Sequence, residues 1–113
     1  MIHYIQGFVK LMPEKLYHLG CKLGSVYPTA LLFGDPARCS LLQKLVDDYE
    51  LVSQHRGYVL YNGLFKGMSF TFGSLGIGGP SWVIGLHELN LAGTKTFLRV
   101  GTSGILSSRV SPG

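Results

Sequence analysis

The stretch that decides the fold is residues 28–38, which read PTALLFGDPAR. Its first half contains the continuous apolar run 30–33, and such a run suits a strand that is buried on both faces, as in a parallel sheet. Gly34 then ends the run. We therefore predict a buried strand over residues 28–33.

The second half of this stretch carries the signals of a helix start. Asp35 can cap the first free amides, and Pro36 suits the first turn because its fixed φ is already helical. We predict a helix over residues 37–46. Its expected apolar face consists of Leu41, Leu42 and Leu45. A strand, a tight turn and a helix together make half of a βαβ unit.

A hairpin is expected further along the chain. Residues 58–65 and 68–73 are rich in strand-forming side chains, and Lys66-Gly67 between them is a typical turn. The Gly-rich loop 74–81 follows, and its Pro80 favours the start of a second helix, which extends to about residue 91. The side chains at helical spacing on one face of that helix are Trp82, Leu86 and Leu89.

The last predicted element is a short apolar strand over residues 96–100, followed by the turn residues Gly101-Thr102. The order of elements indicates an α/β fold with a mixed, mostly parallel sheet flanked by helices. We expect one domain, with a poorly patterned lead-in over residues 1–14 and an unstructured tail over residues 107–113. Because the pattern stops as this strand ends, we interpret the sequence as a truncated domain.

Composition excludes several classes of function. The chain has 113 residues, 46% hydrophobic and 14% charged, which is enough for one packed domain. The net charge is +4, but the basic residues are scattered singly, which argues against a nucleic-acid surface. No segment approaches the ~20 apolar residues of a membrane helix. Cys21 and Cys39 lack metal-binding spacing and suit reduced thiols in the cytoplasm.

Three arginines stand where arginine is unexpected. Arg38 lies in the first turn of the first predicted helix, Arg56 separates two apolar segments, and Arg99 lies inside the last strand. A charge within an apolar strand needs a partner. For Arg99 that partner could be a carboxylate such as Glu88, in a structural salt bridge, or an anionic ligand. Several converging guanidinium groups would suit a phosphate.

Two turns support the ligand alternative. Gly34 and Gly101-Thr102 both follow strands, on the side where open α/β sheets bind ligands, and backbone amides and a hydroxyl there can hold phosphate oxygens. Taken singly, each glycine would more simply form a turn. The loop 76–81, GIGGPS, lacks the Lys of a phosphate-binding P-loop, and no nucleophile and base stand together. The pattern favours binding of an anion over covalent catalysis.

Six segments together resemble the nucleoside phosphorylases of the hexameric type. They are YHLG at 17–20, GDPAR at 34–38, HRGY at 55–58, GIGGPS at 76–81, Glu88-Leu89, and TFLRVGTSG at 96–104. They follow the family's order and spacing from about residue 17 to residue 106. The segments 76–81 and 96–104 are more similar to uridine phosphorylase than to purine nucleoside phosphorylase. The match is with the N-terminal part of the family's single domain.

The resemblance implies a three-layer fold and a set of site residues. The implied phosphate-binding residues are Gly34, Arg38, Arg56, Arg99 and Thr102. The implied ribose-binding residues are His18 and Thr102, and those near the base are Ser103 and Gly104. Arg56 and His18 would act across a dimer interface of a homo-oligomer. The implied reaction is phosphorolysis of uridine to uracil and ribose 1-phosphate, with inorganic phosphate as co-substrate and no cofactor.

The sequence departs from the family pattern in two ways. Gly57 replaces a glutamate that helps to hold a monovalent cation, so no metal is expected here although Ile77 and Ser81 are present. The resemblance also stops before the family's base-recognition segment and its acidic ribose-binding motif, so we expect impaired phosphorolysis. The alternatives are a purine nucleoside phosphorylase and an inactive fragment that binds full-length subunits.

Overall fold

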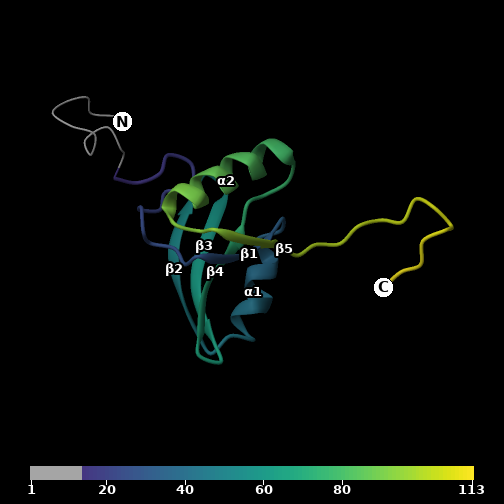
Figure 1. Ribbon diagram of the computed structural model, residues 1–113, viewed down its shortest axis with the longest axis horizontal. Helices are drawn as coiled ribbons and strands as arrows, with labels where there is room; N and C mark the ends of the chain where they lie inside the picture. Colours follow the sequence, from purple (N-terminus) through teal and green to yellow (C-terminus); the bar gives the residue numbers. More distant parts are fainter. Residues whose placement is uncertain (1–13) are drawn as a thin grey trace.

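A computed structural model describes residues 14–113, so the expected lead-in over 1–14 lies almost wholly outside the described residues. This part of the chain forms five strands and two helices (Figure 1). They are β1 (Thr29–Phe33), α1 (Ala37–Gln43), β2 (Asp48–His55), β3 (Tyr58–Phe65), β4 (Met68–Ser74), α2 (Gly79–Ala92) and β5 (Thr96–Arg99).

The strands form one sheet in the order β2-β3-β4-β1-β5. β1 pairs in parallel with β4 and β5, whereas β2, β3 and β4 form an antiparallel meander. The predicted mixed α/β sheet is confirmed, but only half of its pairings are parallel. The difference arises because β2 was not predicted: six of its eight residues are exposed, and a bulge between Leu51 and Ser53 interrupts its alternation.

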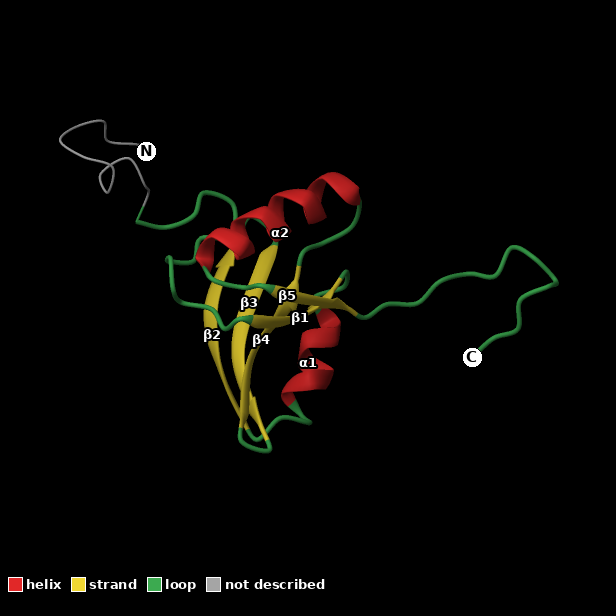
Figure 2. Cartoon of the chain, viewed as in Figure 1, coloured by secondary structure: helices red, strands yellow, loops and turns green. Residues whose placement is uncertain are grey.

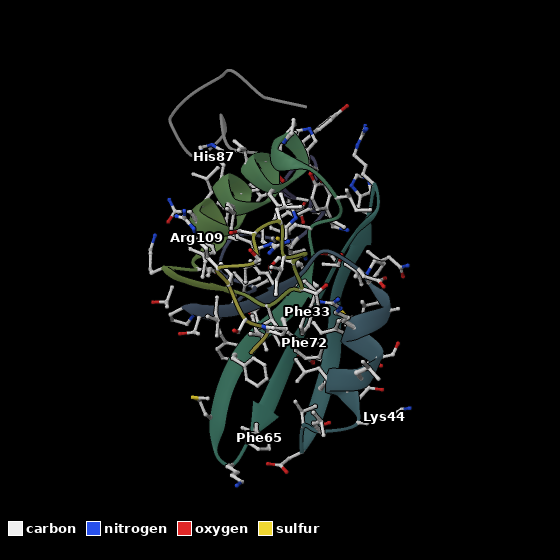
Figure 3. The ribbon with its side chains drawn as sticks, turned by 90° about the vertical axis from the view of Figure 1, so that its right-hand side faces the viewer. Phe33, Lys44, Phe65, Phe72, His87 and Arg109 are labelled. Carbon is white, nitrogen blue, oxygen red and sulfur yellow. The ribbon has the colours of Figure 1, made fainter. Side chains whose placement is uncertain are left out.

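Helices cover both faces of the sheet, which gives three layers (Figure 2). Alternate residues of β1 face opposite ways: Ala30 and Leu32 pack with Leu89 of α2. Phe33 packs instead with Cys39 of α1 and with Phe72, and Figure 3 shows the two phenyl rings together. The apolar run that suggested a strand buried on both faces is therefore placed as expected.

Both antiparallel connections are two-residue turns. Lys66 (φ 49°) and Gly67 (φ 81°) join β3 to β4, as predicted. Arg56 (φ 51°) and Gly57 (φ 84°) join β2 to β3 in the same way. Two successive positive φ values define the tight hairpin turn that matches strand twist, and glycine suits the second position. The glycine at position 57 thus follows from local backbone geometry.

Helix α1 is shorter than predicted. It ends at Gln43, and Pro36 rather than Asp35 occupies its N-cap, although Asp35 Oδ1 accepts the Ala37 amide at 2.9 Å. The expected apolar face is also wrong in part. Leu42 packs towards the sheet, but Leu41 and Leu45 are exposed. The residues that pack are Cys39 and Leu42 within α1 and Val46 in the segment that follows it.

Strand β5 is an exposed edge, not a buried apolar strand. All four of its residues are exposed, and it pairs only with β1. Arg99 therefore does not carry a buried charge. Residues 100–113 form no helix or strand, and Figure 1 shows them leaving the body of the sheet as an extended segment.

The buried thiol of Cys39 makes stability depend on pH. Burial, and secondarily the negative charge of Asp35, raises the pKa of this thiol to about 11 from 9.0. Because the pKa is higher in the folded state, the thiolate favours unfolding, and stability falls as pH rises above 9. We expect a loss of about 1 kcal/mol by pH 10 from this group. Urea denaturation at pH 8 and pH 10 measures this loss of unfolding free energy. In the Cys39→Ser variant, the free energy of unfolding should fall less between these two pH values.

Candidate functional site

Three loops meet where parallel strands end. β1 leads to Gly34, β4 to the loop from Ser74, and β5 to Gly101. Because these strands are parallel, their carboxyl ends lie along one edge of the sheet. Hydrogen bonds join the first two loops: Ser74 Oγ donates to the Gly34 carbonyl at 3.0 Å and accepts from the Gly76 amide at 3.3 Å. These hydrogen bonds connect the turn after β1 to the loop after β4.

Arg38 links the first helical turn to the loop after β5. Its Nη2 donates to Thr102 Oγ1 at 3.4 Å, a long hydrogen bond between residues far apart in sequence. This contact places a guanidinium group and a hydroxyl side by side, next to the turn at Gly34. The two sequence-predicted residues are therefore brought together.

Arg99 lies against the same loop from the side of α2. Its Cζ is 5.2 Å from the centroid of the Trp82 ring, within the range of a cation–π contact. The side chain also folds back over Gly101, where a Cβ atom would lie 2.9 Å from Nη1. Arg38 and Arg99 thus border the two residues Gly101 and Thr102 from different sides. The alternative salt bridge between Arg99 and Glu88 is not formed, because that carboxylate has other partners.

Arg56 lies at the same edge, two strands away from β1, on the turn between β2 and β3. Its Nη2 donates to the Tyr17 hydroxyl at 2.9 Å, and its Cζ lies 4.5 Å from the centre of that ring. Arg56 and Pro36 line one surface pocket, so the turn approaches the start of α1. The structure does not join Arg56 to Arg38 or Arg99. Its contact with Tyr17 was not predicted from the sequence.

The three guanidinium groups are not neutralised within residues 14–113. The ion pairs of this part of the chain are His18 with Glu88 and Lys22 with Glu14. The edge of the sheet consequently carries a local excess of positive charge. Guanidinium groups donate several N–H bonds in one plane, which is the geometry that phosphate oxygens accept.

His18 is held by Glu88 of α2. His18 Nδ1 lies 2.6 Å from Glu88 Oε2, and Oε1 accepts the backbone amides of His18 and Leu19 at 3.0 and 2.9 Å. One buried carboxylate therefore fixes both the loop and the imidazole, and it leaves Nε2 as the free ring nitrogen. The role of Glu88 was missed. The signal for it was an acidic residue next to Leu89 on the buried face of a helix.

The remaining predicted residues differ in their contacts. Ser103 and Gly104 lie in the exposed segment after β5. Ser81 Oγ donates to the Leu75 carbonyl at 2.6 Å, whereas Ile77 is exposed.

No cluster of three or more His, Cys, Asp or Glu side chains that could hold a metal occurs in residues 14–113. Over the same range, no helix has the length and apolarity needed to cross a membrane.

This geometry defines the chain as an open α/β protein with a candidate anion site at the carboxyl edge of its sheet. No family model matches the sequence. The uridine phosphorylase of Thermococcus kodakarensis is 39% identical over 97 residues, 86% of this chain and 35% of that protein. The guanosine phosphorylase of Halorubrum lacusprofundi is 42% identical over 96 residues, 85% of this chain and 40% of that protein.

A solved structure has a similar fold. The crystal structure of uridine phosphorylase from Vibrio fischeri matches with a TM-score of 0.81 and 34% identity, and the match covers 87% of this chain and 41% of that one. The chain belongs to the nucleoside phosphorylase family and corresponds to the N-terminal part of its uridine phosphorylase-like members. It spans well under half the length of these relatives.

Proposed function

We propose that this edge of the sheet is the phosphate-binding half of a nucleoside phosphorylase site. Inorganic phosphate is held by Arg38 and Arg99, by the hydroxyl of Thr102 and by the backbone at Gly34, and it needs no cofactor. The observation that carries the proposal is the contact between Arg38 and Thr102, because it brings together two predicted ligands that are 64 residues apart. A cation–π contact keeps Arg99 beside them.

The reaction we propose is phosphorolysis of uridine. A phosphate oxygen forms a bond to C1′ of the ribose as the bond from C1′ to the base breaks, and the base leaves with the electron pair of that bond. The products are uracil and ribose 1-phosphate. The chain's contribution is to hold the phosphate and its negative charge in line with C1′, so positioning and electrostatics lower the barrier without a protein nucleophile.

The ribose side of the site uses His18. Glu88 orients the imidazole so that Nε2 can accept a hydrogen bond from a sugar hydroxyl. His18 and Arg56 serve the site of a second copy in a cytoplasmic homo-oligomer, and Ser103 and Gly104 contact the base. Guanosine is the second candidate substrate, since the guanosine phosphorylase of Halorubrum is as similar to this chain as the uridine phosphorylases are.

Titration of the 113-residue chain with phosphate tests the site. Amide signals of Gly34, Arg38 and Thr102 in nitrogen-15 NMR spectra should shift and saturate at millimolar phosphate, whereas chloride at equal ionic strength should leave them unchanged. Shifts that rise linearly, and equally with chloride, would contradict the site. Release of uracil or guanine in the presence of phosphate then identifies the base. We expect it to be slow because the two residues proposed to contact the base, Ser103 and Gly104, lie in an exposed segment.

The Gly101→Ala variant probes the position of Arg99. The new methyl group would lie where the guanidinium now is, so we expect the side chain to move and phosphate affinity to fall by about threefold to tenfold. The urea midpoint should stay unchanged, because the atom displaced is the end of a flexible side chain. Gly79→Ala is the matched control, since a Cβ atom there meets nothing within 4 Å. Equal loss of affinity in both variants would exclude a specific effect at Arg99.

A further inference from the structure

We propose that Trp82 is the positioning residue for the phosphate-binding Arg99. The proposal rests on the proposed function and adds to it a residue outside the predicted ligand set. Trp82 lies in the first turns of α2, and its ring is partly buried beside the core below that helix. One edge of the indole is fixed to the loop after β4, and its ring lies next to the guanidinium of Arg99.

The indole is fixed by a hydrogen bond. Trp82 Nε1 donates to the Gly76 carbonyl at 2.7 Å. That carbonyl lies 3.4 Å from the position of a Cβ atom on Gly34, so the same oxygen abuts the turn after β1. The ring is therefore tied, through Gly76, to the loop that carries the first half of the site. Its orientation does not depend on core packing alone.

The other contact of the ring is with Arg99. The guanidinium carbon is 5.2 Å from the ring centroid, while β5 itself is an exposed edge strand. An exposed arginine side chain samples many rotamers, and ordering it on binding costs entropy. A contact with the aromatic ring restricts the rotamers of Arg99 before phosphate binds. It also leaves N–H groups in the plane of the guanidinium free to donate to phosphate. Trp82 thus links the turn at Gly34 to the guanidinium of Arg99.

Two substitutions separate the aromatic face from simple packing. Trp82→Leu removes the π face, whereas Trp82→Phe keeps a ring but loses the Nε1–H bond. We expect phosphate affinity to fall by about fivefold in Trp82→Leu and by no more than about twofold in Trp82→Phe. Leu86→Ala is the packing control, because Leu86 lies one turn further along the same face of α2 and is also partly buried. It should lower the urea midpoint without weakening phosphate binding.

Spectroscopy reports the contact directly. In the unmodified chain the side-chain protons of Arg99 should be shifted upfield by the indole ring current, and Trp82→Leu should abolish this shift. Trp82 is the only tryptophan of the sequence, so its fluorescence should change on addition of phosphate and should not change in Arg99→Gln.

Each result decides the proposal. It is supported if the ring-current shift is present and Trp82→Leu weakens phosphate binding more than Trp82→Phe and Leu86→Ala do. It is overturned if the shift is absent, or if Leu86→Ala costs as much affinity as Trp82→Leu. If the unmodified chain does not bind phosphate saturably, the proposed function itself fails, and that outcome is seen before any Trp82 variant is compared.

Discussion

Replacing Glu88 by alanine is expected to lower the free energy of unfolding by about 3 kcal/mol. This carboxylate is only 8% exposed, and it accepts the backbone amides of His18 and Leu19 as well as the His18 ring. Alanine would leave two amides without a partner next to the buried face of α2. Urea denaturation measures the loss. In nitrogen-15 NMR spectra, the amide signals of His18 and Leu19 should move furthest, since they lose their acceptor.

Glu50→Ala is the matched control for this prediction. Glu50 is an exposed glutamate on β2, and its removal should change the free energy of unfolding by less than about 0.5 kcal/mol. Glu88→Gln should fall between the two, because an amide oxygen can still accept a backbone N–H group. If Glu88→Ala and Glu50→Ala cost the same, the carboxylate is not what holds the segment around His18 to α2.

The segments whose structure the sequence predicted are those in which local signals and burial agree. The run at 30–33 is apolar because both faces of β1 are covered, and Lys66-Gly67 has the turn chemistry that its positive φ values require. β2 could not be found this way, because an exposed strand needs no apolar alternation. The predicted helix was too long because the apolar residues Leu45 and Val46 follow Gln43, where the helix has already ended; Leu45 is exposed and Val46 packs from the turn.

The candidate site likewise has some features that the sequence predicts and others that it does not. The positions of Gly34, Arg38 and Thr102 follow from parallel strands whose carboxyl ends share one edge, so pattern and topology suffice. The argument from a buried charge at Arg99 was wrong in its premise, since β5 is exposed. The supporting contacts made by Tyr17, Glu88 and Trp82 depend on which side chains meet across the fold. Apart from the acidic residue on the buried face of α2, the sequence carries no signal for these contacts.

The largest functional effect is expected at Arg38. In the proposed site this guanidinium donates to phosphate from the first turn of α1, and its contact with Thr102 fixes the direction of approach. Removing it in Arg38→Ala should weaken phosphate binding by roughly 30-fold, which corresponds to about 2 kcal/mol. Arg38→Lys should recover part of the affinity, because an ammonium group keeps the charge but cannot donate in a bidentate way. The NMR titration with phosphate measures both.

Lys44→Ala distinguishes a local contact from a general effect of charge. Lys44 is an exposed cation at the C-terminal end of the same helix, so its removal changes the net charge by the same amount without touching the edge of the sheet. We expect its effect on phosphate affinity to stay below about twofold at physiological ionic strength, because exposed charges separated by more than about 8 Å are largely screened. If Lys44→Ala loses as much phosphate affinity as Arg38→Ala, phosphate binding depends only on the overall positive charge of the chain. A large difference between the two variants would instead place the anion at the turn between β1 and α1.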